Sequence, residues 1–274
     1  MNIQLSDHFN YRKLIKFTLP SIAMMIFTSI YSVVDGFFVS NFAGKTPFAA
    51  INLIMPVLMI LGTVGFMFGT GGTALVAKTY GEGDKEKADR YFSLFVYVAT
   101  AIGVVLAIFG FIFIRPIAEL LGAEGSLLEN CVLYARIVLL ALPFFILQVM
   151  FQSFLVAEEK PQMGLTVTVS AGLTNIALDA LLVILLPKTY KLAGAAIATA
   201  MAQFVGGMVP LVFFIRNKNG ILCLGKTEFD GSALFKACTN GIISINQPSI
   251  PISNQTGCYL LFSFFPIYPI TEIT

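Results

Sequence analysis

Six long apolar runs constrain the fold of this chain more than any other feature of its sequence. Each run has about 20 residues or more, the length that an α-helix needs to cross the hydrocarbon core of a bilayer. Only 12% of the residues are charged and 57% are apolar, whereas a soluble domain carries about 25% charged residues. The sequence therefore predicts an all-α integral membrane protein. The runs are 14–39, 48–76, 91–114, 137–157, 163–186 and 192–215.

Most connections between these runs are short, so consecutive helices must lie antiparallel and side by side. We expect one six-helix transmembrane bundle over residues 14–216, preceded by an N-terminal interfacial segment at 1–13. A longer connection is expected at 115–136, with a short helix near 117–121. Twelve of the 17 basic residues fall on the side of the N-terminus, which the positive-inside rule assigns to the cytoplasm.

Residues 242–274 differ in character from the rest of the chain. They hold four prolines and one charged residue, Glu272, and the prolines interrupt each apolar run before it reaches a membrane-crossing length. Such a segment is neither a good helix nor a solvated disordered tail. We interpret it as frame-shifted or unfolded, with a genuine interfacial tail as the alternative.

Asp35 is a carboxylate near the end of the first apolar run. A charge inside a membrane costs several kcal/mol, about 3 on insertion scales, so as a rule it has a function or a partner. A medium of low dielectric constant favours the neutral form of a carboxyl group, which allows exchange of H⁺ near neutral pH or binding of Na⁺. The alternative is an inert carboxylate that snorkels to the headgroups and is hydrogen-bonded there.

Asn175 and Asp179 lie four residues apart in the fifth run and therefore share a helix face. An amide oxygen beside a carboxylate is the beginning of an oxygen-rich cation site, and it equally suits a proton held in a hydrogen-bond network. The alternative is a polar clasp that only holds helices together. A charged Asp is a costly residue for a clasp that an uncharged Asn could form. The presence of two intramembrane carboxylates therefore favours ion-coupled transport.

Proline and small residues mark other positions in the runs. Pro20 and Pro56 each free a backbone carbonyl and permit a bend, although proline is common in membrane helices. Because Pro20 shares its run with Asp35, a bend coupled to protonation is one interpretation. Small residues crowd the second and sixth runs and predict close helix packing: Gly62, Gly65, Gly69, Gly71, Gly72, Gly194, Ala195, Ala196, Ala198, Ala200, Gly206 and Gly207.

Nothing in the sequence predicts an enzyme or a nucleic-acid-binding protein. The four cysteines are scattered and form no CxxC pair, so neither a metal site nor a disulfide framework is indicated. Residues 81–84 contain the GxGD pattern of intramembrane aspartyl proteases, but they lie in a charged connection outside the apolar runs. The single histidine, His8, also lies outside the runs.

Several motifs, taken in order, resemble those of MATE (multidrug and toxic compound extrusion) transporters, in particular the N-terminal half of the bacterial multidrug branch. The similarity covers about residues 10–241. The motifs are Pro20, Val34-Asp35-Gly36-Phe37-Phe38-Val39-Ser40, Gly71-Gly72-Thr73-Ala74, Gly81-Glu82-Gly83-Asp84 with Ala88, Asn175 with Leu178-Asp179, and Gly194-Ala195-Ala196-Ile197-Ala198-Thr199.

The resemblance implies twelve helices in two six-helix lobes and a plasma-membrane antiporter, monomeric when both lobes are present. A small organic cation or drug would leave the cell as H⁺ or Na⁺ enters, with no other cofactor. The resemblance also implies that three residues form the family's acidic cluster and that two others are weaker candidates for it. In the family, the first helix is proposed to bend at the position equivalent to Pro20. The cluster residues are Asp35, Asn175 and Asp179; the weaker candidates are Tyr134 and Thr199.

The chain departs from the family in length. Residues 217–241 resemble a cytoplasmic link toward a second lobe, which 242–274 do not supply. We therefore expect a truncated lobe that does not transport alone, or, as an alternative, a homodimer of halves. A lipid-linked precursor flippase and a non-transporting membrane subunit are the other candidates. A flippase groove for anionic lipid requires intramembrane Arg or Lys, and none of the six runs has one beyond its ends.

Overall fold

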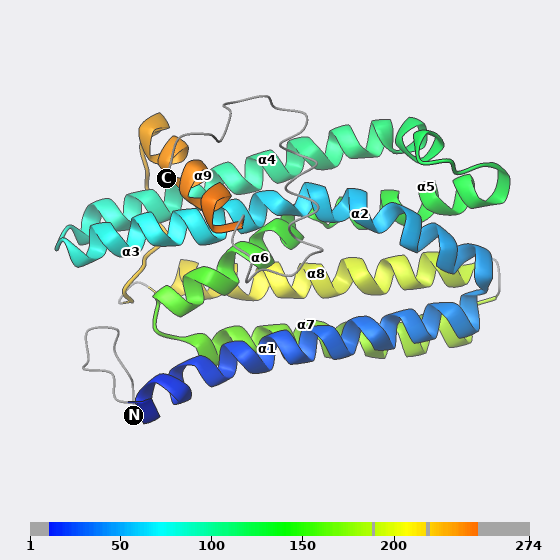
Figure 1. Cartoon of the computed structure of the whole chain (residues 1–274), viewed down its shortest axis with the longest axis horizontal. Helices are drawn as coiled ribbons and strands as arrows, with labels where there is room; N and C mark the ends of the chain where they lie inside the picture. The colour runs from blue at the N-terminus through cyan, green and yellow to red at the C-terminus, as the bar shows by residue number, and fades with distance from the viewer. Residues whose placement is uncertain (1–10, 188–189, 218–219, 246–274) are drawn as a thin grey trace, which may run out of the picture.

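The computed structural model describes residues 11–245, apart from 188–189 and 218–219, and this part of the chain consists of helices and their connections without a strand (Figure 1). The predicted all-α fold is confirmed. The predicted segments at 1–13 and 242–274 lie mostly outside the described residues. The helices are α1 (Tyr11–Phe38), α2 (Lys45–Met67), α3 (Thr73–Gly81), α4 (Lys85–Leu120), α5 (Gly125–Leu140), α6 (Leu142–Ala157), α7 (Pro161–Leu185), α8 (Lys191–Arg216) and α9 (Gly231–Ile245), with π-helical turns η1 (Val39–Ala43) and η2 (Phe68–Gly72).

Five helical stretches in the described part are long and apolar enough to cross a membrane. The helices α5 and α6 add a sixth if the pair, bent by 58°, is counted as one span. Each of the six predicted runs overlaps one of these stretches or the bent pair along most of its length. The five unbroken stretches are Thr18–Ala43, Lys45–Gly81, Lys85–Leu120, Pro161–Leu185 and Lys191–Arg216.

The predicted connection at 115–136 is wrong. Helix α4 continues to Leu120 and α5 begins at Gly125. Glu129 and Arg136 interrupt the apolar pattern but not the helix, because charged side chains leave the backbone hydrogen bonds intact. The break comes instead at Ala141, one residue before the first turn of α6 with its Pro143, since proline lacks the N–H that would continue the helix. Arg136 therefore lies within α5, the first helix of the bent pair that can be counted as a sixth span.

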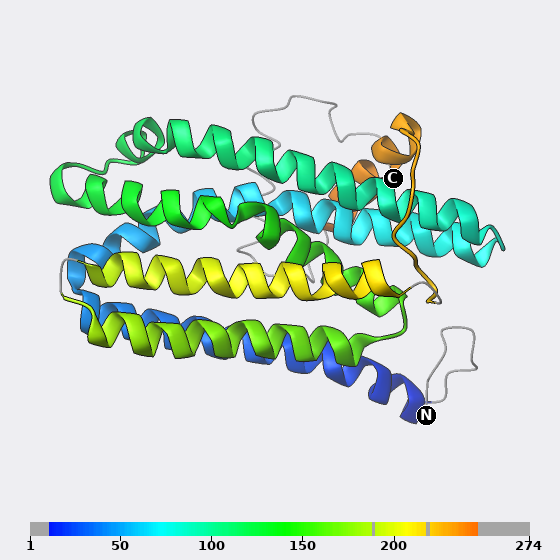
Figure 2. The same cartoon turned by 180° about the vertical axis from the view of Figure 1, so that it is seen from behind.

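Helix α6 runs diagonally through the middle of the bundle (Figure 1) and contacts α2, α4 and α8. On the other side α7 packs between α1 and α8 (Figure 2). The contact of α2 with α6 depends on small residues: a Cβ at Gly65 would lie 2.6 Å from the carbonyl oxygen of Ile146, and one at Gly69 would lie 3.2 Å from the Cα of Met150. The predicted close packing along the second run is thus confirmed.

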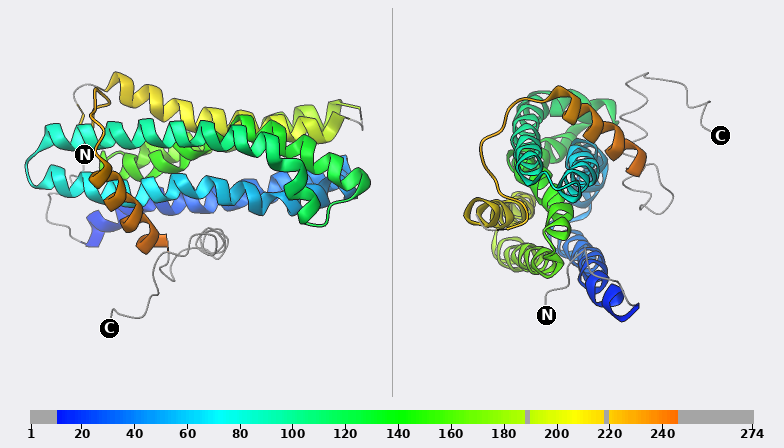
Figure 3. Two further views of the ribbon diagram at one scale, coloured as in Figure 1. Left: turned by 90° about the horizontal axis from the view of Figure 1, so that it is seen from above. Right: turned by 90° about the vertical axis from the view of Figure 1, so that its left-hand side faces the viewer.

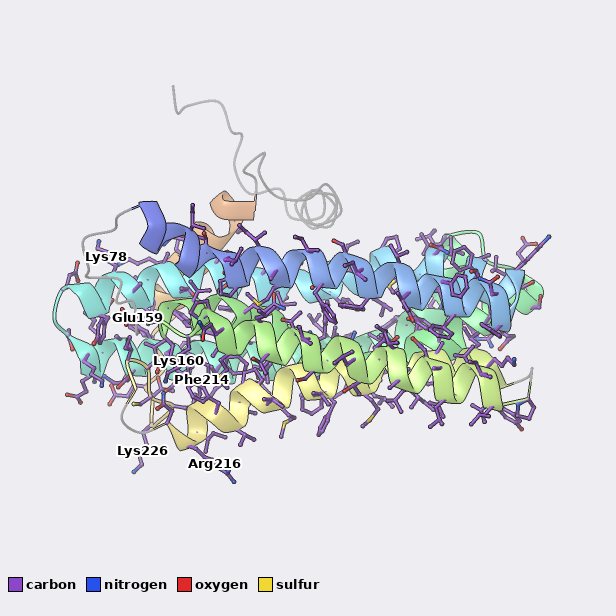
Figure 4. All side chains as sticks on the ribbon, turned by 90° about the horizontal axis from the view of Figure 1, so that it is seen from below. Lys78, Glu159, Lys160, Phe214, Arg216 and Lys226 are labelled. Carbon is purple, nitrogen blue, oxygen red and sulfur yellow. The ribbon has the colours of Figure 1, made fainter. Side chains whose placement is uncertain are left out.

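A cluster of buried phenylalanines joins α4, α6 and α8 near one end of the bundle. The ring centroid of Phe92 lies 4.8 Å from that of Phe214 and 4.9 Å from that of Phe154. Phe151 stacks on Phe214 at 5.3 Å. Such aromatic pairs contribute about 0.5–1.5 kcal/mol each beyond the burial of their area. Figure 4 labels Phe214 at this end, close to Lys160.

Glu158 organises the same end of the molecule. It lies in the turn between α6 and α7, only 2% exposed, and its carboxylate accepts hydrogen bonds from the backbone N–H of Leu222 at 2.7 Å and from Nδ2 of Asn217 at 2.7 Å. The N–H of Ile221 donates a longer bond, and Lys160 Nζ forms an ion pair at 3.2 Å. A buried carboxylate with this many donors is well compensated.

The first turns of α4 also form hydrogen bonds to the connection between α8 and α9. Asp89 Oδ1 accepts from the N–H of Cys223 at 2.8 Å, and Lys85 Nζ donates to the carbonyl of Gly220 at 2.7 Å. Ser93 Oγ accepts from the N–H of Gly225 at 3.0 Å. We call this set, together with Glu158, the end clasp. It fixes the path of the chain from α8 toward α9.

Helix α9 lies across the bundle at a steep angle to its axis (Figure 3) and packs on η2, α2 and α3. Its buried face carries a small residue every fourth position, Ala233, Ala237 and Gly241. A Cβ at Gly71 of η2 would fall inside van der Waals contact with the backbone of Ala237 and Gly241. Residues 231–241, predicted as part of a link, therefore belong to a docked helix that continues past the expected boundary at 241 to Ile245.

Candidate functional site

A cavity of about 120 Å³ opens among α1, α2, α5, α6, α7 and α8. Four of the predicted site residues line it, each from a different helix. Around them the wall is mostly apolar, with Met55, Leu58 and Met59 from α2. Such a mixture of apolar wall and few polar groups is typical of a small-molecule site. The four lining residues are Asp35, Tyr134, Asn175 and Thr199.

Asp35 and Asp179 form the acidic centre of this site. Asp35 lies one turn before the end of α1, and Asp179 lies on the face of α7 that packs against α1. Asp179 is fully buried, and the two carboxyl groups lie within interaction distance of each other. Asn175, one turn earlier on α7, is 2% exposed and completes the predicted group.

Tyr134 and Thr199 close the opposite side of the site. The Tyr134 side chain is 1% exposed, and its hydroxyl lies near that of Thr199 and within electrostatic reach of both carboxyl groups. Thr199 Oγ1 donates to the carbonyl of Ala195 at 3.1 Å, which leaves its lone pairs for a neighbour. The structure thus brings all five predicted residues together from α1, α5, α7 and α8.

Several oxygen atoms of the side chains at this site accept no hydrogen bond from the described part of the protein. Six buried polar atoms at the site have no hydrogen-bond partner among the described residues: Oδ1 of Asp35, both carboxylate oxygens of Asp179, Oδ1 of Asn175, the hydroxyl of Tyr134 and Oε1 of Gln203. An ionised carboxylate only accepts hydrogen bonds, and each unsatisfied buried group costs about 1–3 kcal/mol. The arrangement is suited to take up a proton or a hard cation that prefers oxygen ligands, such as Na⁺.

Pro20 lies apart from the cavity. It is buried within α1, fifteen residues before Asp35, which corresponds to about 22 Å along a helix. A bend at Pro20 would therefore act on the carboxylate through the length of α1. Its role as a hinge stays a prediction.

Three polar residues of the cavity were not singled out from the sequence. Tyr31 lies one turn before Asp35 and shares its helix face, and Gln148 and Gln203 supply amide groups from α6 and α8. The amide of Gln148 lies directly over Gly206, where a Cβ would overlap it. An amide inside a predominantly apolar run is the signal that could have found both glutamines, although Gln148 shares its run with Gln152.

None of the six apolar runs has a basic residue beyond its ends, but α5 begins twelve residues before the run 137–157 and so includes Arg136. Arg136 is the twelfth residue of α5, which is part of the bent α5–α6 span. It does not reach the cavity, because it lies on another side of α5 from Tyr134 and Val138, which line the cavity. Its guanidinium carbon lies 5.0 Å from the ring centroid of Phe111 on α4.

A bundle of helices that are long and apolar enough to cross a membrane defines this chain as a multi-pass membrane protein. Residues 20–181 match the model of the MatE family. The chain belongs to this family.

The most similar curated relatives include two proteins named Multidrug export protein MepA. The chain is 27% identical over 206 residues to that of Staphylococcus haemolyticus, covering 75% of this chain and 45% of the relative. It is 25% identical over 209 residues to that of Staphylococcus aureus, covering 76% and 46%. The chain therefore spans less than half the length of the curated relatives that it matches.

Solved structures confirm the architecture. The outward-facing conformation of a multidrug resistance MATE family transporter of the MOP superfamily superimposes with a TM-score of 0.79 at 21% identity, covering 92% of this chain and 53% of that one. The inward-facing conformation of such a transporter gives a TM-score of 0.72 at 23% identity, with coverages of 78% and 48%. The predicted fold, one six-helix lobe of a MATE transporter, is confirmed.

Proposed function

We propose that this chain is the ion-coupling lobe of an antiporter that exports small organic cations or drugs in exchange for H⁺ or Na⁺. The observation that carries the proposal is the pair of carboxyl groups from Asp35 and Asp179, placed together by α1 and α7 inside a membrane-spanning bundle. Two neighbouring carboxylates cannot both remain ionised and unpartnered in a medium of low dielectric constant. The site therefore calls for a proton shared between them or a cation bound between them.

The chemistry of the cavity suits a cationic substrate. No Lys, Arg or His is found among the described residues that line it, whereas acidic, amide and aromatic groups are. A tyrosine face attracts organic cations, and Tyr31 and Tyr134 both line the wall. A flippase for anionic lipid would need the opposite charge at this position, and the intramembrane Arg136 lies on another side of α5.

The orientation that we propose has the N-terminus in the cytoplasm and the lobe in the plasma membrane. Lys78, Lys160, Arg216 and Lys226 lie together at the end of the bundle where α1 begins (Figure 4). An excess of basic residues at one end is typical of the cytoplasmic side. The end clasp and α9 are then cytoplasmic, and the α4–α5 end faces outward.

We further propose that the lobe does not transport alone. The chain aligns with about half of each relative, and an antiporter must present its site alternately to the two sides of the membrane. One lobe supplies a single wall of a cleft between two lobes, and alternating access requires the two lobes to rock against each other. A homodimer of this chain would supply a second wall and is the alternative.

The coupling proposal is tested by binding to the purified full chain in nanodiscs. A fluorescent organic cation should displace protons or Na⁺ from the site, measured with a pH indicator and with ²²Na⁺. Asp35→Asn and Asp179→Asn should each abolish the displacement, whereas Glu86→Gln, an exposed carboxylate in the first turn of α4, should leave it unchanged. Displacement that survives in both Asp variants would overturn the coupling role.

Transport itself is tested in vesicles. The full chain and a full-length relative are reconstituted separately, and proton- or Na⁺-driven efflux of the same cation is followed. We expect efflux from the relative, its loss when the position aligned with Asp35 becomes Asn, and no efflux from this chain. Efflux by this chain, with a mass of two copies in native mass spectrometry, would favour the homodimer instead.

A further inference from the structure

Arg136 is an intramembrane charge that the proposed transport mechanism does not use. Among the described residues it has neither an ion pair nor a hydrogen bond, and its Nε is buried without a partner. Glu129, an acid on the same face of α5, is already paired with Arg115 at 2.7 Å. An intramembrane guanidinium without a protein partner is a candidate site for a ligand.

The helix face on which Arg136 lies forms part of the outer surface of the bundle. Glu129, Leu133, Arg136 and Leu140 follow one another at helical spacing on α5, and the two leucines are 41% and 68% exposed. Phe111 on α4, under the guanidinium, is 39% exposed. The helices α4 and α5 lie side by side at this end in both Figure 1 and Figure 2. The charge thus faces the bilayer and not the cavity.

The depth of Arg136 matches the reach of its side chain to the headgroups. It lies seven residues, about 10 Å along the helix, deeper than Glu129, which is exposed together with Arg115. An arginine side chain spans most of that distance when it extends toward the interface. The ring of Phe111 lies 5.0 Å from the guanidinium carbon, which restricts its orientation and leaves N–H donors for a ligand from the bilayer.

We propose that Arg136, backed by the ring of Phe111, binds the phosphate of an anionic phospholipid in the leaflet around the α4–α5 end of the bundle. The guanidinium offers a planar fork of N–H donors that matches two phosphate oxygens. Leu133 and Leu140 on either side provide an apolar surface for the acyl chains. A phosphate free in water cannot reach a donor flanked in this way, so the ligand must come from the bilayer itself.

The lipid is tested by native mass spectrometry of the full chain released from nanodiscs. One set of nanodiscs contains phosphatidylglycerol, and the other contains monoglucosyl diacylglycerol, which has the same acyl chains but no phosphate. The wild type should retain tightly bound phosphatidylglycerol, and Arg136→Gln should retain about fivefold less, since each basic residue near the surface contributes on this scale. Arg216→Gln removes an exposed arginine at the other end of the bundle that has no such ring behind it among the described residues, and it should lower retention by less than Arg136→Gln does.

Two further measurements keep the proposal open to refutation. Arg136→Lys keeps the charge if the Gln variant fails to insert, and it should also retain less phosphatidylglycerol because an ammonium lacks the fork. The thermal midpoint of the wild type should be higher in phosphatidylglycerol than in the glycolipid, and this difference should shrink in the variants. Equal retention in wild type and variants, or a change in oligomeric mass without a change in bound lipid, would overturn the assignment.

Discussion

The carboxylate of Glu158 and the backbone N–H of Leu222 are joined by a hydrogen bond of 2.7 Å. The two residues lie in different connections, one between α6 and α7 and the other between α8 and α9. This bond and its neighbours tie the end of the bundle to the segment that positions α9. Its contribution to stability is accordingly large.

We expect Glu158→Ala to destabilise the chain by about 3 kcal/mol, because it leaves several buried donors and the Lys160 charge without their acceptor. The measurement is the thermal or denaturant midpoint in detergent. Glu82→Gln is the matched control: its ion pair with Lys78 is 3.9 Å long and exposed, and such pairs are worth about 0–1 kcal/mol. Equal effects of the two changes would show that the clasp carries no special stability.

Gly71→Ala should release α9 from the bundle. The new Cβ would overlap backbone atoms of Ala237 and Gly241, which cannot move aside as a flexible side chain can, and overpacking of this kind costs about 1–3 kcal/mol. Trypsin cleavage after Lys236 in α9 should then accelerate on the order of tenfold. Gly81→Ala has open space around its Cβ and should cleave at the wild-type rate; a similar acceleration there would point to general destabilisation.

Glu159→Gly should stabilise the chain by about 1 kcal/mol, because Glu159 has a φ of 60°, a left-handed conformation that is costly for residues with a Cβ. Glu159→Ala removes the carboxylate but keeps the Cβ and should bring no gain. The thermal midpoints of the three proteins decide the matter. A Gly variant less stable than the wild type would mean that the contacts of the Glu159 side chain outweigh its backbone strain.

Asp179→Asn should raise stability while it removes ion coupling. The amide supplies a permanent N–H donor to Asp35 and removes the cost of neutralising a second buried carboxylate, which we expect to add about 1 kcal/mol. Thermal midpoints, with Glu86→Gln as the surface control, measure the gain. The opposite sign, a fall in the midpoint, would indicate that Asp179 is a structural clasp whose carboxylate is satisfied in the native protein.

Cys223 reports on the end clasp through its pH-dependent reactivity. Burial, followed by the nearby charge of Asp89, raises the pKa of the Cys223 thiol. Since the thiolate is the reactive form, alkylation at Cys223 should be slow at pH 7 and should still be rising above pH 9. Site-resolved mass spectrometry with iodoacetamide measures the rate, and Glu158→Ala should increase it. A rate at pH 7 equal to that of glutathione would contradict the clasp geometry.

The acidic site could be predicted from local patterns, whereas its surroundings could not. Asp35 and Asp179 each stand out because a carboxylate in an apolar run is expensive, and the four-residue spacing of Asn175 and Asp179 places both on one face. Their meeting across α1 and α7 depends on tertiary packing. The resemblance to a family, and not periodicity, brought Tyr134 and Thr199 into the group.

Charged residues led to wrong predictions where they lie inside a helix or in a buried turn. Glu129 and Arg136 interrupt an apolar run, so α5 was expected to be a connection. Glu158 reads as part of a short charged turn, yet it is buried, because its partners in 217–222 arrive from about sixty residues away. No local pattern in the sequence records such a pairing.

The glycine contact between η2 and α9 has a mechanical consequence. At this contact backbone rests on backbone, so no flexible side chain separates Gly71 from α9. A shift of the π-helical turns at Phe68–Gly72, which continue α2, would therefore move α9 directly, and the second membrane span thus sets the direction in which α9 crosses the bundle.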